Sequence, residues 1–83
     1  MKLLYFAWLR AKIGIAEETV QPPTNVGTVA ALLDWLKKRG PRFADALKDV
    51  SVVRVAVNQE YVRGDHPVRP GDEVALFPPV TGG

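Results

Sequence analysis

Only one stretch of this sequence has the pattern of a long amphipathic helix, and that limits how a sheet in this chain can be covered. Its apolar residues follow the i, i+3, i+4, i+7 spacing of a single stripe: Val29, Leu32, Leu33 and Leu36. Thr28 can cap the start. Lys37–Arg39 place positive charge in the last turn, where the helix dipole favours it, before Gly40-Pro41 ends the helix. A helix over 28–39 is therefore predicted, with an anion-binding patch at 37–39 as the alternative interpretation of the basic residues.

Strand-like runs lie on both sides of this helix. They are Lys2–Leu9, Glu17–Gln21, Val52–Asn58, Tyr61–Val62 and Glu73–Phe77. The first is apolar on both faces, which favours a buried central strand, and the second meets two prolines, which favours a sheet edge. The remaining stretches are predicted to be a short connection with one helical turn closed by Gly14 (10–15), a second short helical turn (42–48), a loop (63–69) and a type II turn at Pro70-Gly71.

This order of elements is α+β, and the β-grasp arrangement satisfies it. We expect a ubiquitin-like β-grasp with a mixed sheet of four or five strands and one main helix on one face. The alternation of the strands then places the following residues on the uncovered face: Leu4, Phe6, Arg54, Ala56, Ala75 and Phe77. An exposed aromatic patch usually marks a partner site, and a locally shielded cluster is the alternative.

Composition excludes several classes of function. The chain has 83 residues, of which 47% are hydrophobic, which suits one small domain. It has no cysteine, so it has no disulfide, thiolate metal site or cysteine nucleophile. The net charge of +2 is small and scattered, which does not favour nucleic-acid binding. Residues 3–9 are too few to span a membrane and no signal peptide is evident, so we expect a soluble cytoplasmic protein.

The C-terminal residues combine a predicted strand end, two prolines and two final glycines. The strand ending at Phe77 is followed by Pro78-Pro79, which cannot donate to a sheet ladder, and then by Val80, Thr81, Gly82 and Gly83. Two residues without side chains can enter a narrow channel in another protein. We therefore expect a domain at 1–79 and a flexible tail at 80–83, with chain-end fraying as the alternative.

No catalytic constellation is present. The sequence lacks phosphate-binding and dinucleotide-binding glycine motifs, its one histidine (His66) lies in a predicted loop, and its one serine (Ser51) has no glycine-flanked elbow. The remaining reactive group is the carboxylate of Gly83, which needs activation, usually as an acyl-adenylate. Attack by a sulfur donor would then give a thiocarboxylate, and attack by an amine an isopeptide bond.

Four segments carry a resemblance to a known family. They are Val57-Asn58-Gln59, Asp65-His66-Pro67, Gly71-Asp72-Glu73-Val74-Ala75 and Phe77 to Gly83. The sequence resembles the small subunit of molybdopterin synthase, the MoaD family of ubiquitin-like sulfur carriers, over essentially its whole length.

The resemblance implies a function for the tail. An adenylyltransferase of the MoeB type would activate Gly83 with ATP and Mg, and the terminus would become a thiocarboxylate. Val80, Thr81 and Gly82 would lead Gly83 into a large subunit of the MoaE type, within a heterotetramer, to convert cyclic pyranopterin monophosphate to molybdopterin. Phe6, Tyr61 and Phe77 match the family's partner-contact positions. The chain itself would be no enzyme and would bind no metal or cofactor, since the catalytic residues belong to the large subunit.

Other functions stay open at this point. A thiazole-type sulfur carrier is related, although such chains are usually shorter and lack Pro-Pro before the tail. A ubiquitin-like protein modifier would use the same tail to form isopeptide bonds. A plain binding module would use the sheet face alone and would not need the two glycines.

Overall fold

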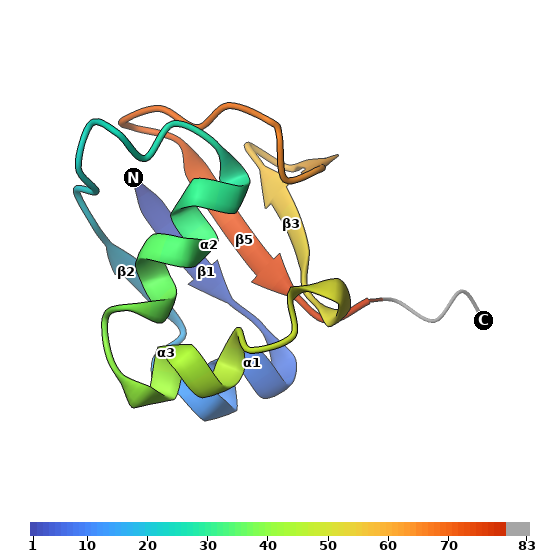
Figure 1. The fold of residues 1–83 in the computed structure, drawn as a ribbon. Coiled ribbons are helices and arrows are strands. Elements are labelled where there is room, and N and C mark those ends of the chain that lie inside the picture. The colour runs from blue at the N-terminus through green and yellow to red at the C-terminus, as the bar shows by residue number, and fades with distance from the viewer. Residues whose placement is uncertain (80–83) are drawn as a thin grey trace.

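The computed structural model describes residues 1–79, and Val80, Thr81, Gly82 and Gly83 lie outside the described residues. The predicted flexible tail is therefore not tested. In chain order the elements are β1 (Lys2–Tyr5), α1 (Ala7–Ile13), β2 (Glu17–Thr19), α2 (Val29–Lys37), α3 (Pro41–Ala46), the 3-10 turn η1 (Val50–Val52), β3 (Arg54–Val57), β4 (Glu60–Val62) and β5 (Glu73–Phe77) (Figure 1).

Within residues 1–79 the strands form one five-stranded sheet in the order β2-β1-β5-β3-β4. β1 and β5 run parallel, and the other neighbours are antiparallel. The sheet is therefore mixed, β1 lies inside it and β2 lies at its edge, as predicted. The α+β, β-grasp expectation is confirmed.

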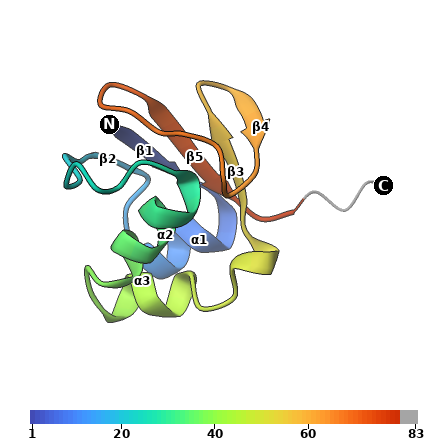
Figure 2. The same cartoon turned by 45° about the horizontal axis from the view of Figure 1, so that its top comes forward.

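The helices all lie on one side of this sheet (Figure 2). Leu32 and Leu36 of α2 are fully buried and pack in the same core as Val74 and Leu76 of β5. Burying one such side chain contributes about 1.5–3 kcal/mol. The main helix begins as predicted, because the Thr28 hydroxyl oxygen accepts a hydrogen bond from the Ala31 N–H at 3.2 Å.

The end of α2 differs slightly from the prediction. The helix stops at Lys37 with Lys38 as its C-cap, before Gly40 is reached. Gly40 and Pro41 instead begin α3, where proline at the first helical position has no need of its missing N–H. The predicted second helical turn is thus α3, which begins at Pro41.

The predicted strand Lys2–Leu9 is wrong in its second half. β1 ends at Tyr5, and α1 begins at Ala7, whose φ is +53°. Leu9 and Ile13, four residues apart, are both buried on one side of α1. Gly14 closes the helix in the left-handed region, with its N–H donating to the Arg10 carbonyl oxygen, as its place in the sequence predicted. An apolar run alone does not show where a strand turns into a helix.

Two further elements refine the prediction. β3 begins at Arg54, because residues 50–52 form η1, whose start is capped by the Asp49 side chain. The short strand at Tyr61-Val62 is confirmed as part of β4. In the turn before it, Asn58 has φ +50° and Gln59 has φ +72°, as a two-residue type I′ hairpin requires. Across the described part of the chain, no helix has the length and apolarity needed to cross a membrane.

Candidate functional site

Within residues 1–79 the helices leave one face of the sheet uncovered, and the C-terminal strand β5 is part of that face (Figure 2). Residues paired across neighbouring strands share a face, and Tyr61, Ala56, Ala75 and Leu4 form one such row across β4, β3, β5 and β1. Arg54 and Phe77 form the next pair on the same face. We call this surface the open face; it comprises Leu4, Phe6, Arg54, Ala56, Tyr61, Ala75 and Phe77. The face assignment made from sequence alternation is confirmed.

The three predicted partner-contact residues all reach this open face. Tyr61 is 80% exposed and Phe6 48% exposed, while Phe77 is partly buried. The rings of Tyr61 and Phe77 lie 5.4 Å apart between centroids, at 45°. The small side chains of Ala56 and Ala75 lie on the central strands β3 and β5, between Tyr61 of β4 and Leu4 of β1, so the middle of the face is apolar. Their contact with a partner stays a prediction.

The chain leaves the sheet at one end of the open face. β5 ends at Phe77, and Pro78 and Pro79 carry no N–H with which to continue the ladder. We call Phe77–Pro79 the tail root. Arg54 pairs with Phe77 in the register, and its guanidinium Nη1 donates to the Ser51 carbonyl oxygen at 3.0 Å, which orders η1 beside the tail root. Figure 1 shows η1 next to the point where the chain departs.

The four predicted tail residues are not placed. Val80, Thr81, Gly82 and Gly83 lie outside the described residues, so no geometry bears on their predicted roles. What the structure gives is the platform before them: a rigid strand end, a pair of prolines and an aromatic surface.

A polar clamp at the other end of β5 was missed by the sequence reasoning. Asn58 Nδ2 donates to Asp72 Oδ1 at 3.1 Å, and the Glu73 N–H donates to Asn58 Oδ1 at 3.0 Å. The Arg69 N–H donates to Asp72 Oδ2 at 2.8 Å, across the predicted turn in which Gly71 has φ +90°. The hydrogen bond from Asn58 is the main reason that the pKa of Asp72 is lowered. Two of the motifs that carried the resemblance therefore meet here and fix the register of the sheet.

Tyr5, Glu18 and Arg39 form a hydrogen-bonded group that has a structural role. The Tyr5 hydroxyl donates to Glu18 Oε2 at 2.6 Å, and Arg39 Nη1 donates to the same oxygen at 2.7 Å. Burial, followed by the hydrogen bond and the charge of Glu18, raises the pKa of Tyr5. Burial of Glu18 opposes its ionisation, but the hydrogen bonds from Arg39 and Tyr5 and the Arg39 charge outweigh burial and lower the pKa of Glu18. Arg39 also lies 4.8 Å from the Phe43 ring centroid, so the group joins β1, β2, α3 and the end of α2.

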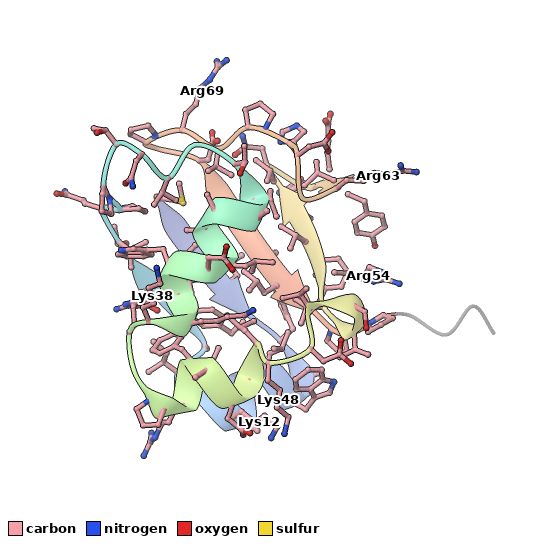
Figure 3. The ribbon with its side chains drawn as sticks, in the orientation of Figure 1. Lys12, Lys38, Lys48, Arg54, Arg63 and Arg69 are labelled. Carbon is pink, nitrogen blue, oxygen red and sulfur yellow. The ribbon has the colours of Figure 1, made fainter. Side chains whose placement is uncertain are left out.

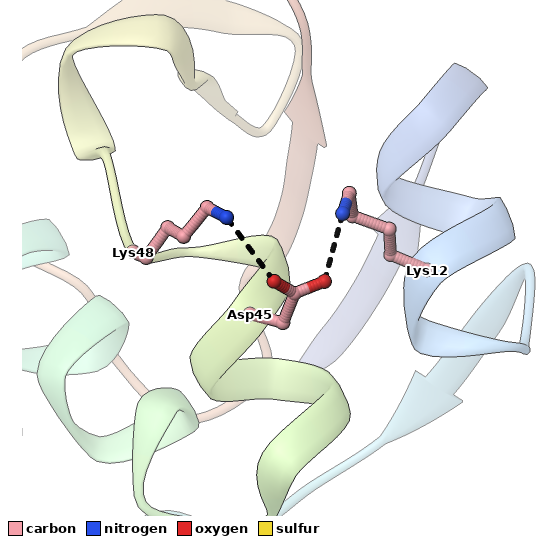
Figure 4. A network of polar contacts seen from close by, with 3 residues as sticks. All are labelled: Lys12, Asp45 and Lys48. Atoms are coloured by element: carbon pink, nitrogen blue, oxygen red, sulfur yellow. Dashed lines mark hydrogen bonds and ion pairs between the residues drawn. The ribbon is translucent and has the colours of Figure 1, made fainter.

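A second polar group joins two helices on the surface. Asp45 of α3 contacts Lys12 of α1 at 2.7 Å and Lys48 at 3.3 Å (Figure 4). The hydrogen bonds from these lysines lower the pKa of Asp45.

His66 Nδ1 lies 2.8 Å from the Pro67 carbonyl oxygen, in the predicted loop. Over residues 1–79, His, Asp and Glu side chains nowhere gather in a group of three that could hold a metal ion.

The described residues thus form an uncovered sheet face with exposed aromatic side chains, which ends where the chain leaves the sheet. The ThiS family matches residues 3–83. The chain belongs to the ThiS family.

Relatives in this family have informative names. The molybdopterin synthase sulfur carrier subunit of Escherichia coli (strain K12) is 42% identical over 83 residues, which covers 100% of this chain and 99% of that protein. The putative molybdopterin converting factor, subunit 1, from Pyrococcus furiosus has 34% identity and a TM-score of 0.76, with 95% of each chain covered. The small archaeal modifier protein 1 of H. volcanii has 28% identity and a TM-score of 0.75, with 96% and 97% covered. The resemblance to the MoaD sulfur carriers is confirmed.

Proposed function

We propose that this chain is the sulfur carrier subunit of a molybdopterin synthase and carries sulfur as a thiocarboxylate on Gly83. The observation that carries the proposal is the match of the whole chain to the Escherichia coli sulfur carrier subunit at 42% identity, since it includes the tail as well as the domain. The platform before the tail is in keeping with it, because β5 holds Phe77 in a rigid sheet directly ahead of the two prolines.

The chemistry needs an activating enzyme. A carboxylate is a poor electrophile, so one oxygen of Gly83 attacks the α-phosphate of ATP, and pyrophosphate leaves. A sulfur donor then attacks the acyl carbon, and AMP leaves with the oxygen that it took. An adenylyltransferase of the MoeB type would supply the ATP and Mg site, so this chain needs no cofactor of its own. ATP is available in the cytoplasm, where we expect this chain to be located.

The sulfur is then delivered within a second complex. The Escherichia coli relative is named a subunit, which supports a large-subunit partner for this chain as well. In this proposal the open face packs on that partner through Phe6, Tyr61 and Phe77, and Gly83 reaches its active site. The residues that act on the pterin belong to the large subunit, and this chain is a sulfur-donating rather than a catalytic component.

The intact mass of the chain tests the charging step. After incubation with the adenylyltransferase, ATP and a sulfur donor, the mass should rise by the replacement of one oxygen with sulfur, and fragmentation should place the change at Gly83. A chain that lacks Gly82 and Gly83 should stay unchanged. If the full chain keeps its original mass with an adenylyltransferase that charges a known carrier, the proposal fails.

A second candidate is supported by the likeness to the small archaeal modifier protein 1. A protein modifier would be joined through Gly83 to lysine side chains. Digestion of a cell lysate would then leave Gly-Gly remnants on lysines, and deletion of the gene would leave molybdopterin production unchanged. The sulfur-carrier proposal predicts loss of molybdopterin on deletion.

A further inference from the structure

The helix side of the sheet has a part that α2 does not cover. The hairpin of β3 and β4 lies to the side of α2 (Figure 2), and Val55 and Val62 face each other across this hairpin on the helix side. A hollow of about 520 Å³ lies between these valines and Leu33 of α2. Val55 and Leu33 are buried and Val62 is partly buried, so the floor of this hollow is aliphatic. We call it the α2–β4 groove.

The rim of the groove is mainly basic. Lys37 of α2 and Arg63 after β4 line it, and Asp34 is the carboxylate among its lining residues. Arg54 of β3 also lines the groove, but its register with Phe77 places its side chain on the open face. Lys37 Nζ lies 4.0 Å from Asp34 Oδ1, at the limit of an ion pair. Neither Arg54 nor Arg63 has a carboxylate within 4.0 Å among residues 1–79. Figure 3 shows both arginines on the β3–β4 side of the molecule.

The groove adjoins the tail root. Arg54 lines the groove and is also the register partner of Phe77, the last residue before the two prolines. Val50, an exposed residue of η1, lines the groove as well. A protein that receives the tail beside Phe77 therefore lies within reach of the groove without losing its contact with the open face.

These features select the chemistry of the occupant. An aliphatic floor favours aliphatic side chains, and a rim with the cations Lys37 and Arg63 against the single carboxylate of Asp34 favours acidic ones. The lining residues include no aromatic side chain on which a nucleic-acid base could stack. The occupant that satisfies both conditions is a protein segment that combines aliphatic and acidic residues.

We propose that the α2–β4 groove is a second docking site, which takes an acidic, aliphatic segment of the large synthase subunit. This inference rests on the proposed function, because it takes the large subunit as the partner. Together with the open face, this second site would fix the orientation of the carrier on the large subunit. It would also make the affinity of the carrier for the large subunit dependent on ionic strength.

Charge reversal in the groove, with a matched control, tests the inference. The test variant is Lys37→Glu with Arg63→Glu, and the control is Lys38→Glu with Arg69→Glu, which makes the same change of net charge at sites outside the groove lining. Figure 3 shows Lys38 and Arg69 away from the β3–β4 side. The dissociation constant for the purified large subunit is measured at low and high salt, together with thermal melting of each variant. The neutral variant Lys37→Gln with Arg63→Gln replaces the test variant if charge reversal impairs folding.

The inference predicts at least a tenfold weaker binding at low salt for the test variant, a smaller salt dependence, and less than a twofold change for the control. Equal binding by test and control variants would overturn the inference and leave the proposed function standing, provided that the wild type binds. Absence of binding by the wild type would contradict the proposed function, and the inference with it.

Discussion

The backbone N–H of Phe6 donates a hydrogen bond to the carbonyl oxygen of Leu76 at 3.1 Å. This bond extends the parallel pairing of β1 and β5 by one residue, so Phe6 is held beside the strand end that leads into the tail root. The chain then turns at Ala7 and enters α1. A backbone hydrogen bond thereby fixes the position of an exposed aromatic residue next to the tail root. Side-chain packing alone would not fix this position.

Truncation of Phe77 should weaken partner binding more than folding. Phe77 is partly buried and contacts Tyr61 on the open face, so Phe77→Ala removes an aromatic contact that a partner can bury. A loss of about 2 kcal/mol in binding the large subunit is expected, with a smaller change in stability. Calorimetric titration beside thermal melting measures both. Val26→Ala, at a partly buried apolar side chain in the loop before α2 that packs against the core, is the control and should leave binding unchanged. A collapse of melting in Phe77→Ala would show that Phe77 is a core residue.

The positive φ of Ala7 should make this position intolerant of branched side chains. At +53°, a side chain branched at Cβ crowds the backbone. Ala7→Val should lower the free energy of unfolding by about 1–3 kcal/mol, while Ala7→Gly should change it by less than about 1 kcal/mol, since glycine enters this region freely but adds entropy to the unfolded chain. Urea unfolding measures both. Equal stability of the two variants would contradict the strained turn.

The polar clamp at Asn58 should respond differently to glycine and to alanine. Both substitutions remove the hydrogen bonds to Asp72 and Glu73, but only alanine also resists the φ of +50°. Asn58→Gly should destabilise the fold by about 1–2 kcal/mol, and Asn58→Ala by roughly 1 kcal/mol more. Chemical denaturation resolves a difference of this size. An alanine variant more stable than the glycine variant would contradict the left-handed turn at Asn58.

Acid should destabilise the fold through Glu18 and Asp72. Both carboxyls have pKa values below their usual range in the folded chain, so the unfolded chain takes up protons first as pH falls. Their contribution is complete above the usual carboxyl pKa of about 4 and is lost as pH falls through the lowered values. Melting temperatures between pH 7 and pH 3, at about 0.1 M salt, should therefore drop below about pH 4.5. Glu18→Gln should flatten this drop, and an unchanged slope in that variant would contradict the assignment.

The sequence could predict the elements with simple periodicity. The stripe from Val29 to Leu36, the alternation of Val55 and Val57, and Glu73–Phe77 each had one face that must be buried, so helix, strands and open face followed. Trp8 and Leu9 could not be assigned in this way, because an apolar run suits either a buried strand or the first turn of a buried helix. The change of structure there occurs at Ala7, a residue with no strong preference for a positive φ.

The candidate site was predictable only in part. Phe6, Tyr61 and Phe77 could be placed on one face by alternation and by resemblance. The link between Asn58 and Asp72 depends on two turns meeting across the sheet, and the α2–β4 groove depends on how β4 lies to the side of α2. Both are tertiary relationships that no local pattern encodes.

The central claim is that Gly83 gains sulfur and gives it up. The most direct test follows the intact mass of the charged chain after it is mixed with the large subunit and the pterin precursor. We expect the thiocarboxylate to return to the carboxylate while the dithiolene product forms, and a chain without Gly82 and Gly83 to do neither. A product formed with no change of mass at Gly83, or a charged chain that keeps its sulfur in the presence of an active large subunit, would contradict the claim.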